Sequence, residues 1–148
     1  EFHPESNNSV DDIKFTKMKQ DKGVDFLITQ LFFDNKDFLS FKEKAIKNGI
    51  TIPIIPGILP ITSTKQIRRF TKLCGSKIPL KLNEKLENSI NNDKETTKLG
   101  IEYATNQILE LIDNDIPGIH FYSLNKTSSV GHVLNNLGIA NQTPEYII

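Results

Sequence analysis

The hydrophobic and polar positions at the start of the chain predict a helix followed by a strand. Between residues 11 and 22 the apolar side chains recur at helical spacing until Gly23 ends the run. Residues 24–33, VDFLITQLFF, are β-branched and aromatic with few polar breaks. Such a run is typical of a strand that is buried on both faces of a parallel sheet.

A second helix and a second strand follow in the same order. Asp34 and Asn35 offer side chains that can cap a helix, and the amphipathic stretch 38–47 continues from them. Residues 50–55 have the pattern of another buried strand. We expect a loop at 56–60, because its two prolines can continue neither a strand ladder nor a helix.

The second half of the chain is mainly helical. The pattern predicts a helix from a cap at Thr62 or Ser63 to about Gly75, helices at 82–90, 94–114 and 130–137, and a short strand at 117–122. Connections this short suit right-handed crossovers in a parallel sheet. Three strands alone cannot hide both faces of a sheet. The chain is therefore either a small open α/β sheet or an arc of a (βα)8 TIM barrel, whose usual length of ~250 residues exceeds the 148 present.

Composition describes an ordinary soluble globular protein and excludes several kinds of site. The 18 basic residues balance the 18 acidic ones, which argues against broad binding to nucleic acid or to an anionic membrane. No apolar run approaches the ~20 residues of a membrane span and no signal peptide is recognisable, so we expect a cytoplasmic protein. The single cysteine, Cys74, and three scattered histidines predict no disulfide and no metal site.

The carboxyl ends of barrel strands, and the loops after them, form the functional face of a barrel. That rule selects His3, Glu5, Gln30, the loop 56–64 and residues 122–126. The start His3-Pro4-Glu5 has the pattern of a loop after a strand, which favours the barrel arc over the open sheet.

Gln30 is an amide at the end of an apolar strand. Burying it is costly unless a partner satisfies both its donor and its acceptor, and the edge of a ring such as a pterin would do so. A bond to neighbouring backbone is the other interpretation, and spacing alone leaves both open. Gln66 and Phe70, four residues apart, share one face of the third helix. Core packing is the simpler interpretation of Phe70, but a helix at the mouth of a barrel would present both side chains to a planar ligand.

Five segments, in order, give the chain a resemblance to a known enzyme family. They are HPES, ITQLFFD, IPIIPGILPI, the pair KQ with RRF, and GIHFYSLNK, between residues 2 and 139. In order and spacing they resemble the methylenetetrahydrofolate reductases. ITQLFFD with PGILP is the most specific pair, and it makes another flavin barrel, such as a proline dehydrogenase, the weaker interpretation.

The resemblance implies a parallel (βα)8 TIM barrel, of which residues 1–140 would supply roughly the C-terminal half and residues 141–148 a tail. It implies an oxidoreductase with FAD at the carboxyl face of the strands and NADH or NADPH as co-substrate. The nicotinamide would reduce the flavin, which would then reduce 5,10-methylenetetrahydrofolate to 5-methyltetrahydrofolate for one-carbon and methionine metabolism. The implied kinetics are ping-pong.

The resemblance also assigns residues to the cofactor. His3 and Ser6 match positions that line the flavin site. Asp12 and Lys19 match residues that bind the ribityl and phosphate portions of FAD, and a lysine suits a phosphate as a flexible point charge.

The same resemblance assigns Gln30, Gln66, Phe70 and Lys126 to the folate. Gln30 matches the glutamine that contacts the pterin and, in the other half-reaction, the nicotinamide amide. Phe70 matches a phenylalanine that stacks on the ligand, an interaction worth on the order of 0.5–1.5 kcal/mol. Lys126 stands where many relatives have arginine near the folate tail, so the charge is kept and the planar fork is lost.

No catalytic residue is assigned within the chain. The family's general-acid glutamate lies near the start of the barrel, and neither Glu5 nor Glu102 matches its motif. We therefore expect activity to need an N-terminal half, on the same chain or from a partner. An isolated half would expose sheet edges that favour self-association with a second copy. The alternative is a non-catalytic remnant without a cofactor, favoured by Phe15 and Met18, which are apolar where relatives have asparagine and can have arginine.

Overall fold

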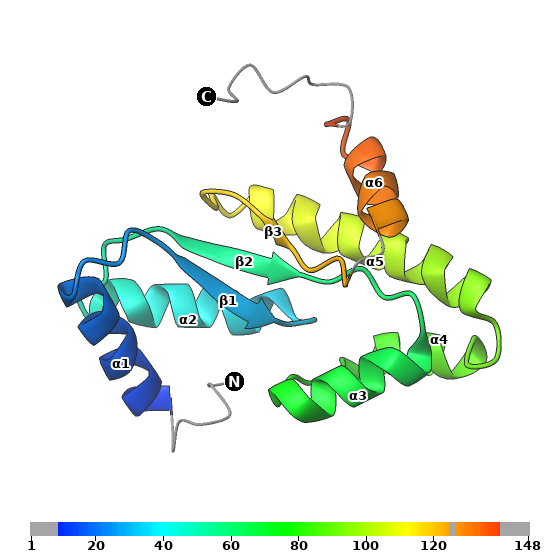
Figure 1. Ribbon diagram of the computed structural model, residues 1–148, viewed down its shortest axis with the longest axis horizontal. Coiled ribbons are helices and arrows are strands. Elements are labelled where there is room, and N and C mark those ends of the chain that lie inside the picture. Colours follow the sequence, from blue (N-terminus) through cyan, green and yellow to red (C-terminus); the bar gives the residue numbers. More distant parts are fainter. Residues whose placement is uncertain (1–8, 125–126, 140–148) are drawn as a thin grey trace.

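The computed structural model describes the chain over residues 9–124 and 127–139. Helices and strands alternate along these residues, except that three consecutive helices lie between the second and third strands (Figure 1). The helices are α1 (Ser9–Asp21), α2 (Asn35–Lys47), α3 (Thr64–Cys74), α4 (Leu80–Asn88), α5 (Asp93–Ile112) and α6 (Thr127–Asn136), and the strands are β1 (Leu27–Leu31), β2 (Ile54–Ile58) and β3 (His120–Phe121). This is the order of elements that the sequence pattern predicts.

The strands form one parallel sheet in the order β1–β2–β3. β1 pairs with β2 from Leu27 and Ile54 onward, and an irregularity before Leu31 shifts the register so that this residue pairs with Gly57. β2 pairs with β3 only at its own carboxyl end, at Gly57 and Ile58. Parallel strands joined through helices are the unit of α/β folds. The predicted α/β class is confirmed, and the sheet is compatible with part of a TIM barrel.

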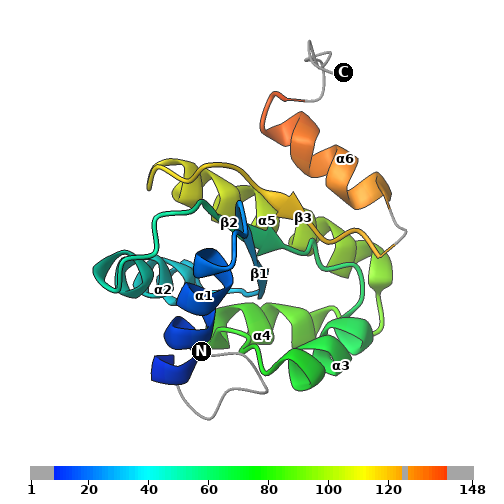
Figure 2. The same cartoon turned by 60° about the vertical axis from the view of Figure 1, so that its left-hand side comes forward.

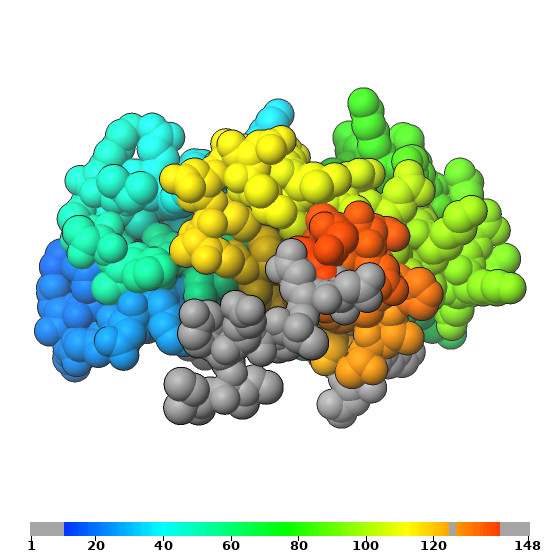
Figure 3. All heavy atoms as spheres, turned by 90° about the horizontal axis from the view of Figure 1, so that it is seen from above, coloured from blue at the N-terminus to red at the C-terminus, as the bar shows by residue number. Residues whose placement is uncertain are grey.

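α2 and α5 cover one face of the sheet (Figures 1 and 2). The core between these helices and the strands includes Phe38, Ala45, Ile54, Ile58, Ile108 and Leu111. A second cluster lies beyond the carboxyl ends of the strands, where α3 and α4 contribute Ile67, Leu82 and Leu86 to it. α6 packs against α5 and adds the buried Val133 to the first cluster (Figure 3). Fully burying one such side chain is worth about 1.5–3 kcal/mol.

The helix ends largely follow the predicted caps. The side chains of Asp34 and Asn92 each accept a backbone N–H from the first turn of α2 and α5, respectively. Gly75 ends α3 with a left-handed φ of 71°, a conformation that glycine adopts without steric cost. Ser63 is the N-cap of α3, but its side chain makes no capping hydrogen bond. The sequence thus places these boundaries to within a few residues.

The predicted loop at 56–60 is wrong over 56–58, because these residues lie inside β2, and the strand predicted at 50–55 begins only at Ile54. A proline is excluded from a strand only where its missing N–H would have to bond a neighbour. Here the register irregularity in β1 falls opposite this position, and the pairing with β3 begins only at Gly57. β3 pairs with β2 only at Gly57 and Ile58, so β3 is shorter than the predicted strand at 117–122.

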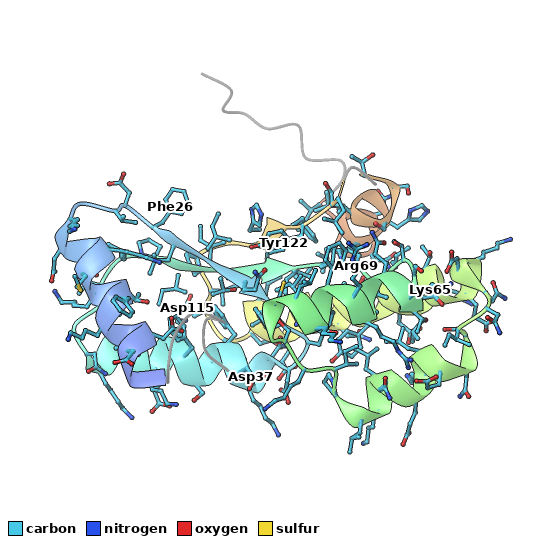
Figure 4. The ribbon with its side chains drawn as sticks, turned by 60° about the horizontal axis from the view of Figure 1, so that its bottom comes forward. Phe26, Asp37, Lys65, Arg69, Asp115 and Tyr122 are labelled. Atoms are coloured by element: carbon cyan, nitrogen blue, oxygen red, sulfur yellow. The ribbon has the colours of Figure 1, made fainter. Side chains whose placement is uncertain are left out.

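β1 was expected to be buried on both faces, and that expectation is wrong for this chain. Its side chains alternate, with Ile28 and Gln30 exposed and Leu31 buried. Phe26, just before the strand, is 51% exposed and points away from the helices in Figure 4. Among the described residues β1 is the edge of the sheet, and nothing covers the face to which these side chains belong.

α1 is joined to the sheet through Gln20. Its side-chain oxygen accepts the backbone N–H of Thr51 at 2.7 Å and of Ile52 at 3.2 Å, and its Nε2 donates to the carbonyl of Gly49 at 3.1 Å. One amide thereby satisfies three backbone groups of the segment that leads into β2.

Among the described residues, no helix combines the length and the apolar content needed to cross a membrane.

Candidate functional site

Side chains from distant parts of the chain bond to the backbone at the carboxyl end of β1. The donors and carbonyl acceptors are Tyr122 to Thr29 at 2.9 Å, Ser76 to Leu31 at 2.7 Å, Gln107 to Phe32 at 3.0 Å, and Tyr103 to Phe33. Each bond supplies a hydrogen-bond donor to a backbone carbonyl at or just beyond the end of β1. Gln30 lies within this stretch, so its backbone is fixed from both sides.

Tyr122 reaches Thr29 by crossing over Gly57 of β2. A Cβ atom at position 57 would lie 2.5 Å from the carbonyl oxygen of Thr29 and 2.6 Å from Cε2 of Tyr122. The backbone N–H of Gly57 also donates to Oγ1 of Thr29 at 3.0 Å. Position 57 must therefore be glycine, because only then can β1, β2 and Tyr122 pack this closely at the carboxyl ends of the strands.

A cleft with about 180 Å³ of space, open to solvent, lies beside β1. Its floor is apolar and is formed by Leu27, Phe38, Phe41 and Ile54. Polar and charged residues that line the same cleft are Asp12, Thr16, Lys19, Gln30, Asp37 and Ser76. The cleft thus brings together three residues that the sequence assigns to ligands, namely Asp12 and Lys19 on α1 and Gln30 on β1.

α1 offers one unpaired cation to this cleft. Lys19 is exposed, and within the described residues no ion pair engages it. Asp12 is half-buried, and its backbone carbonyl accepts the hydroxyl of Thr16 at 2.8 Å. On the same helix Phe15 and Met18 are 52% and 45% exposed. A cation beside a carboxylate fits a phosphate and a sugar hydroxyl, but these two apolar neighbours add no polar contact.

The side chain of Gln30 is exposed rather than buried, so the argument from the cost of burial does not apply to this chain. Its Oε1 accepts the backbone N–H of Leu31 at 3.0 Å. This is the bond to neighbouring backbone that the other interpretation of Gln30 predicts. This bond satisfies the acceptor and leaves the Nε2 donors without a partner among the described residues. Gln30 can therefore donate to a ligand carbonyl or ring nitrogen in the cleft.

Gln66 and Phe70 line a second, much smaller hollow at the end of β3, whose space of about 10 Å³ is that of a single water molecule. The loop after β2 and the residues Ser123, Leu124 and Ser129 complete its wall. Phe70 is half-buried and also packs against the second core cluster. Phe70 therefore packs against the core, as the simpler interpretation predicts, and its contact with a planar ligand stays a prediction.

Buried hydroxyls fix α3 relative to α4 and α5. Oγ1 of Thr64 donates to the carbonyl of Leu86 at 3.2 Å and lies 3.4 Å from Oγ1 of Thr96, which contacts Oγ of Ser89 at 2.9 Å. Gly100 allows the loop before α3 to touch α5, because a Cβ there would lie 2.0 Å from the carbonyl oxygen of Ile61. The position of Gln66 and Phe70 thus depends on residues far from the hollow.

Two tyrosines whose hydroxyls bond to the end of β1, Tyr103 and Tyr122, have raised pKa values. Burial is the main cause of the raised pKa of Tyr103, with Asp34 and Glu110 adding to it. Burial also raises the pKa of Tyr122, with a smaller contribution from Cys74. Both hydroxyls therefore stay protonated at neutral pH and remain donors to the backbone carbonyls of β1.

Other assigned residues lie elsewhere. His3, Ser6 and Lys126 are outside the residues that the structure describes. His120 makes an edge contact with the ring of Tyr122, with 4.7 Å between ring centroids. In the described ranges no group of three potential ligands gathers to bind a metal ion. Glu102 is exposed on α5, as a solvated charge is expected to be.

Sequence reasoning missed Ser76, Tyr103 and Gln107, which bond to the carboxyl end of β1. None of them lies in a motif, and two are on α5, seventy or more residues from the carbonyls they contact. Tyr122 falls in the selected range 122–126, but its bond to Thr29 depends on the sheet order, which no local pattern encodes.

Comparison with known proteins places the chain among folate enzymes. Residues 1–138 match the family described as "Methylenetetrahydrofolate reductase". The chain is 37% identical to "5,10-methylenetetrahydrofolate reductase" of Buchnera aphidicola subsp. Schizaphis graminum, over 94% of this chain and 48% of the relative. It is 37% identical to "Methylenetetrahydrofolate reductase (NADH) 1" of Arabidopsis thaliana and to "Probable methylenetetrahydrofolate reductase (NADPH)" of Caenorhabditis elegans, covering 95% and 93% of this chain but 23% and 21% of the relatives.

A solved structure agrees with these matches. It is described as "Uncharacterized protein from Clostridium thermocellum binds two copies of 5-methyl-5,6,7,8-tetrahydrofolic acid". The TM-score is 0.59 at 26% identity, and the match covers 88% of this chain and 49% of that one. The chain therefore spans about half the length of this protein and of the bacterial relative, and less of the plant and animal relatives.

Proposed function

Because the chain belongs to the methylenetetrahydrofolate reductase family, we propose that it takes part in the reduction of 5,10-methylenetetrahydrofolate to 5-methyltetrahydrofolate. The observation that carries the proposal is that Gln30 lines the cleft beside β1, while Gln66 and Phe70 line the hollow past the carboxyl ends of β2 and β3. The folate bound by the Clostridium protein supports a folate ligand. The relatives' names support NADH or NADPH as the electron donor.

We propose FAD as the cofactor, bound through His3, Ser6, Asp12 and Lys19. When bound, a flavin supplies the redox centre that accepts hydride from the nicotinamide and delivers it to the folate. The free charge of Lys19 at the rim of the cleft beside β1 fits a phosphate of such a cofactor. Asp12 in the same cleft fits a sugar hydroxyl.

In the proposed reaction the residues of this chain bind and orient rather than transfer protons. Gln30 would donate its Nε2 hydrogens to the pterin or to the nicotinamide amide, which fixes the ring edge relative to the reacting carbon. Phe70 would stack on the aromatic part of the ligand, and Gln66 would bond beside it. The proton donor for opening the folate ring is expected in the part of the relatives that this chain does not span.

A complementing half barrel is part of the proposal. The floor of the cleft beside β1 is apolar, and the open edge of β1 carries exposed Phe26 and Ile28. A parallel strand from the other half would pair with the open edge of β1, and the barrel closed in this way would cover these side chains and complete the walls of the cofactor site. We propose that such a half, on the same polypeptide or from a partner, is needed for catalysis and closes the TIM barrel.

The test compares Gln30→Ala with Asn106→Ala, an exposed amide on α5, in a protein that contains the complete barrel. Gln30→Ala removes a ligand hydrogen bond, so we expect both half-reactions, reduction by NAD(P)H and oxidation by the folate, to slow by about tenfold or more. Rapid-reaction absorbance of the flavin measures each half-reaction separately. Equal rates in the two variants would refute the assignment of Gln30.

The second candidate is a non-catalytic remnant, and the exposed Phe15 and Met18 on α1 favour it. A remnant would fold and associate with itself but retain no flavin in any assembly. Replacing the two residues by Asn and Arg separates the candidates: flavin affinity should rise if α1 lines a working cofactor site, and stay at background if it does not.

A further inference from the structure

α1 forms one wall of the cleft beside β1 but buries few of its own side chains. Asp12, Thr16 and Lys19 of this helix line the cleft. Between residues 11 and 21 only Ile13 and Thr16 are buried. The hydroxyl of Thr16 bonds within the helix, to the carbonyl of Asp12 at 2.8 Å. Apolar packing therefore holds α1 mainly through Ile13, and polar contacts become important for the rest of the helix.

The last turn of α1 is fixed by Gln20. The amide of this residue bonds to the carbonyl of Gly49 and to the N–H groups of Thr51 and Ile52. These groups belong to the segment between α2 and β2, and Figures 1 and 2 show α1 beside α2. The stem of Lys17 also lies beside this segment, with its Cε 3.7 Å from where a Cβ atom of Gly49 would stand. One amide thus joins the end of α1 to backbone 29 to 32 residues further along the chain.

Lys19 directly precedes Gln20 and lies in the same turn. Its carbonyl accepts the backbone N–H of Lys22 at 3.2 Å and of Val24 at 3.3 Å, where the helix ends and the chain turns toward β1. Its ammonium group is exposed at the rim of the cleft and has no ion-pair partner among the described residues. Because the stem of a lysine is flexible, the region that its charge can reach is set by where the backbone of this turn is held.

We propose that Gln20 is a positioning residue for Lys19. The inference rests on the proposed function, in which Lys19 contacts a phosphate of FAD. Gln20 holds the last turn of α1 against the segment before β2, so the charge of Lys19 stays near the place of the phosphate before the cofactor binds. Such preorganisation reduces the ordering that binding would otherwise require. Within the described ranges Gln20 is not one of the residues that line the cleft, so its effect on affinity should pass through Lys19.

The experiment compares the affinities of the complete-barrel protein for FAD and for riboflavin, which has the same ring and ribityl chain but no phosphate. Gln20→Met keeps the length of the side chain and a high helix propensity but removes the three hydrogen bonds. We expect it to lower the ratio of FAD affinity to riboflavin affinity about two- to threefold. Lys19→Ala should lower this ratio about fivefold, as one exposed charge-assisted contact allows. Quenching of flavin fluorescence measures both affinities.

The double variant separates a positioning role from a merely structural one. If Gln20 acts through Lys19, adding Gln20→Met to Lys19→Ala should lower the ratio no further than Lys19→Ala does alone. Two independent effects would instead multiply to a loss of roughly tenfold or more. A multiplied loss would overturn the inference.

Amide hydrogen exchange tests the hydrogen bonds themselves. Exchange at Thr51 and Ile52 should be faster in Gln20→Met than in the unmodified protein, because the acceptor of both N–H groups is removed. Coupling between two sites is reciprocal, so FAD should slow this exchange in the unmodified protein more than riboflavin does. Equal protection of these amides with either flavin bound would show that the phosphate contact and the Gln20 bonds are not coupled.

Lys42→Met is the matched control. Nζ of Lys42 donates to the carbonyls of Asn114 and Asp115 at 3.2 Å and 2.9 Å. This side chain joins α2 to the end of α5 in the way that Gln20 joins α1 to the segment before β2. Its replacement should lower the stability in urea by a similar amount and leave the ratio of affinities unchanged. An equal fall of the ratio in Lys42→Met and Gln20→Met would show a general loss of stability and overturn the inference.

The failure of this inference can be told apart from the failure of the proposed function. If both flavins bind and the preference for FAD falls in Lys19→Ala but not in Gln20→Met, the role of Gln20 is wrong and the proposed cofactor site stands. If the complete-barrel protein binds neither flavin, both are wrong.

Discussion

At the scale of single residues, the close packing at the carboxyl ends of the strands depends on the lack of a side chain at Gly57. Tyr122 crosses Gly57 to reach the carbonyl of Thr29, and it does so because no Cβ atom stands in its way. The sequence PGILP identifies a family motif, yet the reason for its glycine is visible only when the residue after β3 is placed above it. Gln66 and Phe70, by contrast, were predictable from spacing, since helical periodicity alone brings them to one face.

Gly57→Ala should therefore destabilise the protein. A new Cβ atom would clash with the backbone of β1 and with the Tyr122 ring, and overpacking of this kind costs about 1–3 kcal/mol. Urea unfolding of the complete-barrel protein measures the loss. Gly118→Ala is the control, because no atom lies within 4 Å of a Cβ at that position. Equal stability of the two variants would contradict the described packing.

Tyr122 also predicts a dependence of stability on pH. Its folded pKa is raised above the unfolded value of about 10, so its stabilising effect is complete below pH ~10 and is lost as the pH rises through the folded pKa. The free energy of unfolding should fall above pH ~10, and less steeply in Tyr122→Phe than in the unmodified protein. Tyr103 contributes a similar dependence that Tyr122→Phe retains. Identical slopes for the two proteins would show that Tyr122 ionises equally easily in the folded state.

At the scale of elements, α5 is the helix that sets the end of β1. Gln107 and Tyr103 donate to the carbonyls of Phe32 and Phe33, and Nδ2 of Asn35 donates back to the carbonyl of Gln107 at 3.0 Å. Local signals predict α5 to within two residues at each end, as 94–114 against the observed Asp93–Ile112. They do not predict this role, because the bonds join segments about seventy residues apart in the chain.

The errors in element prediction have related physical causes. The β-branched run 24–33 has the composition of a fully covered strand, yet one face of β1 is open among the described residues. The composition of a strand indicates how far its two faces can be buried. It does not indicate which segments cover those faces. The sequence pattern excludes Pro56 from β2 because proline has no backbone N–H to donate to a strand ladder. The register irregularity in β1 removes the need for a donor at that position.

Gln107→Leu tests the role of α5. The change keeps the helix but leaves the carbonyl of Phe32 without its donor in a buried place, which costs about 1–3 kcal/mol. Asn106→Leu, on the exposed side of the same helix, should cost much less. Urea unfolding compares the two, and flavin half-reactions should show that Gln107→Leu slows the reactions that depend on Gln30. A loss of stability without any change in those rates would separate α5 from the site.

At the scale of the whole molecule, the uncovered apolar surface and the length of the relatives agree. Five of the exposed large apolar side chains lie between residues 15 and 28, on α1, on β1 and on the segment that joins them, namely Phe15, Met18, Val24, Phe26 and Ile28. Exposed apolar side chains that form a contiguous patch mark an interface, and we propose that this segment contributes one. The chain spans about half of its bacterial relatives and of the Clostridium protein, and the proposed complementing strand would pair beside β1 at this patch.

The most direct test of the proposed function is the visible absorbance of bound flavin. FAD is added to this chain alone and to the chain folded together with a polypeptide that supplies the rest of a relative's barrel, and free flavin is then removed. We predict that only the combined protein retains flavin, and that NADH or NADPH bleaches it. Stoichiometric flavin that bleaches on the chain alone, or a folded combined protein that retains none, would contradict the account.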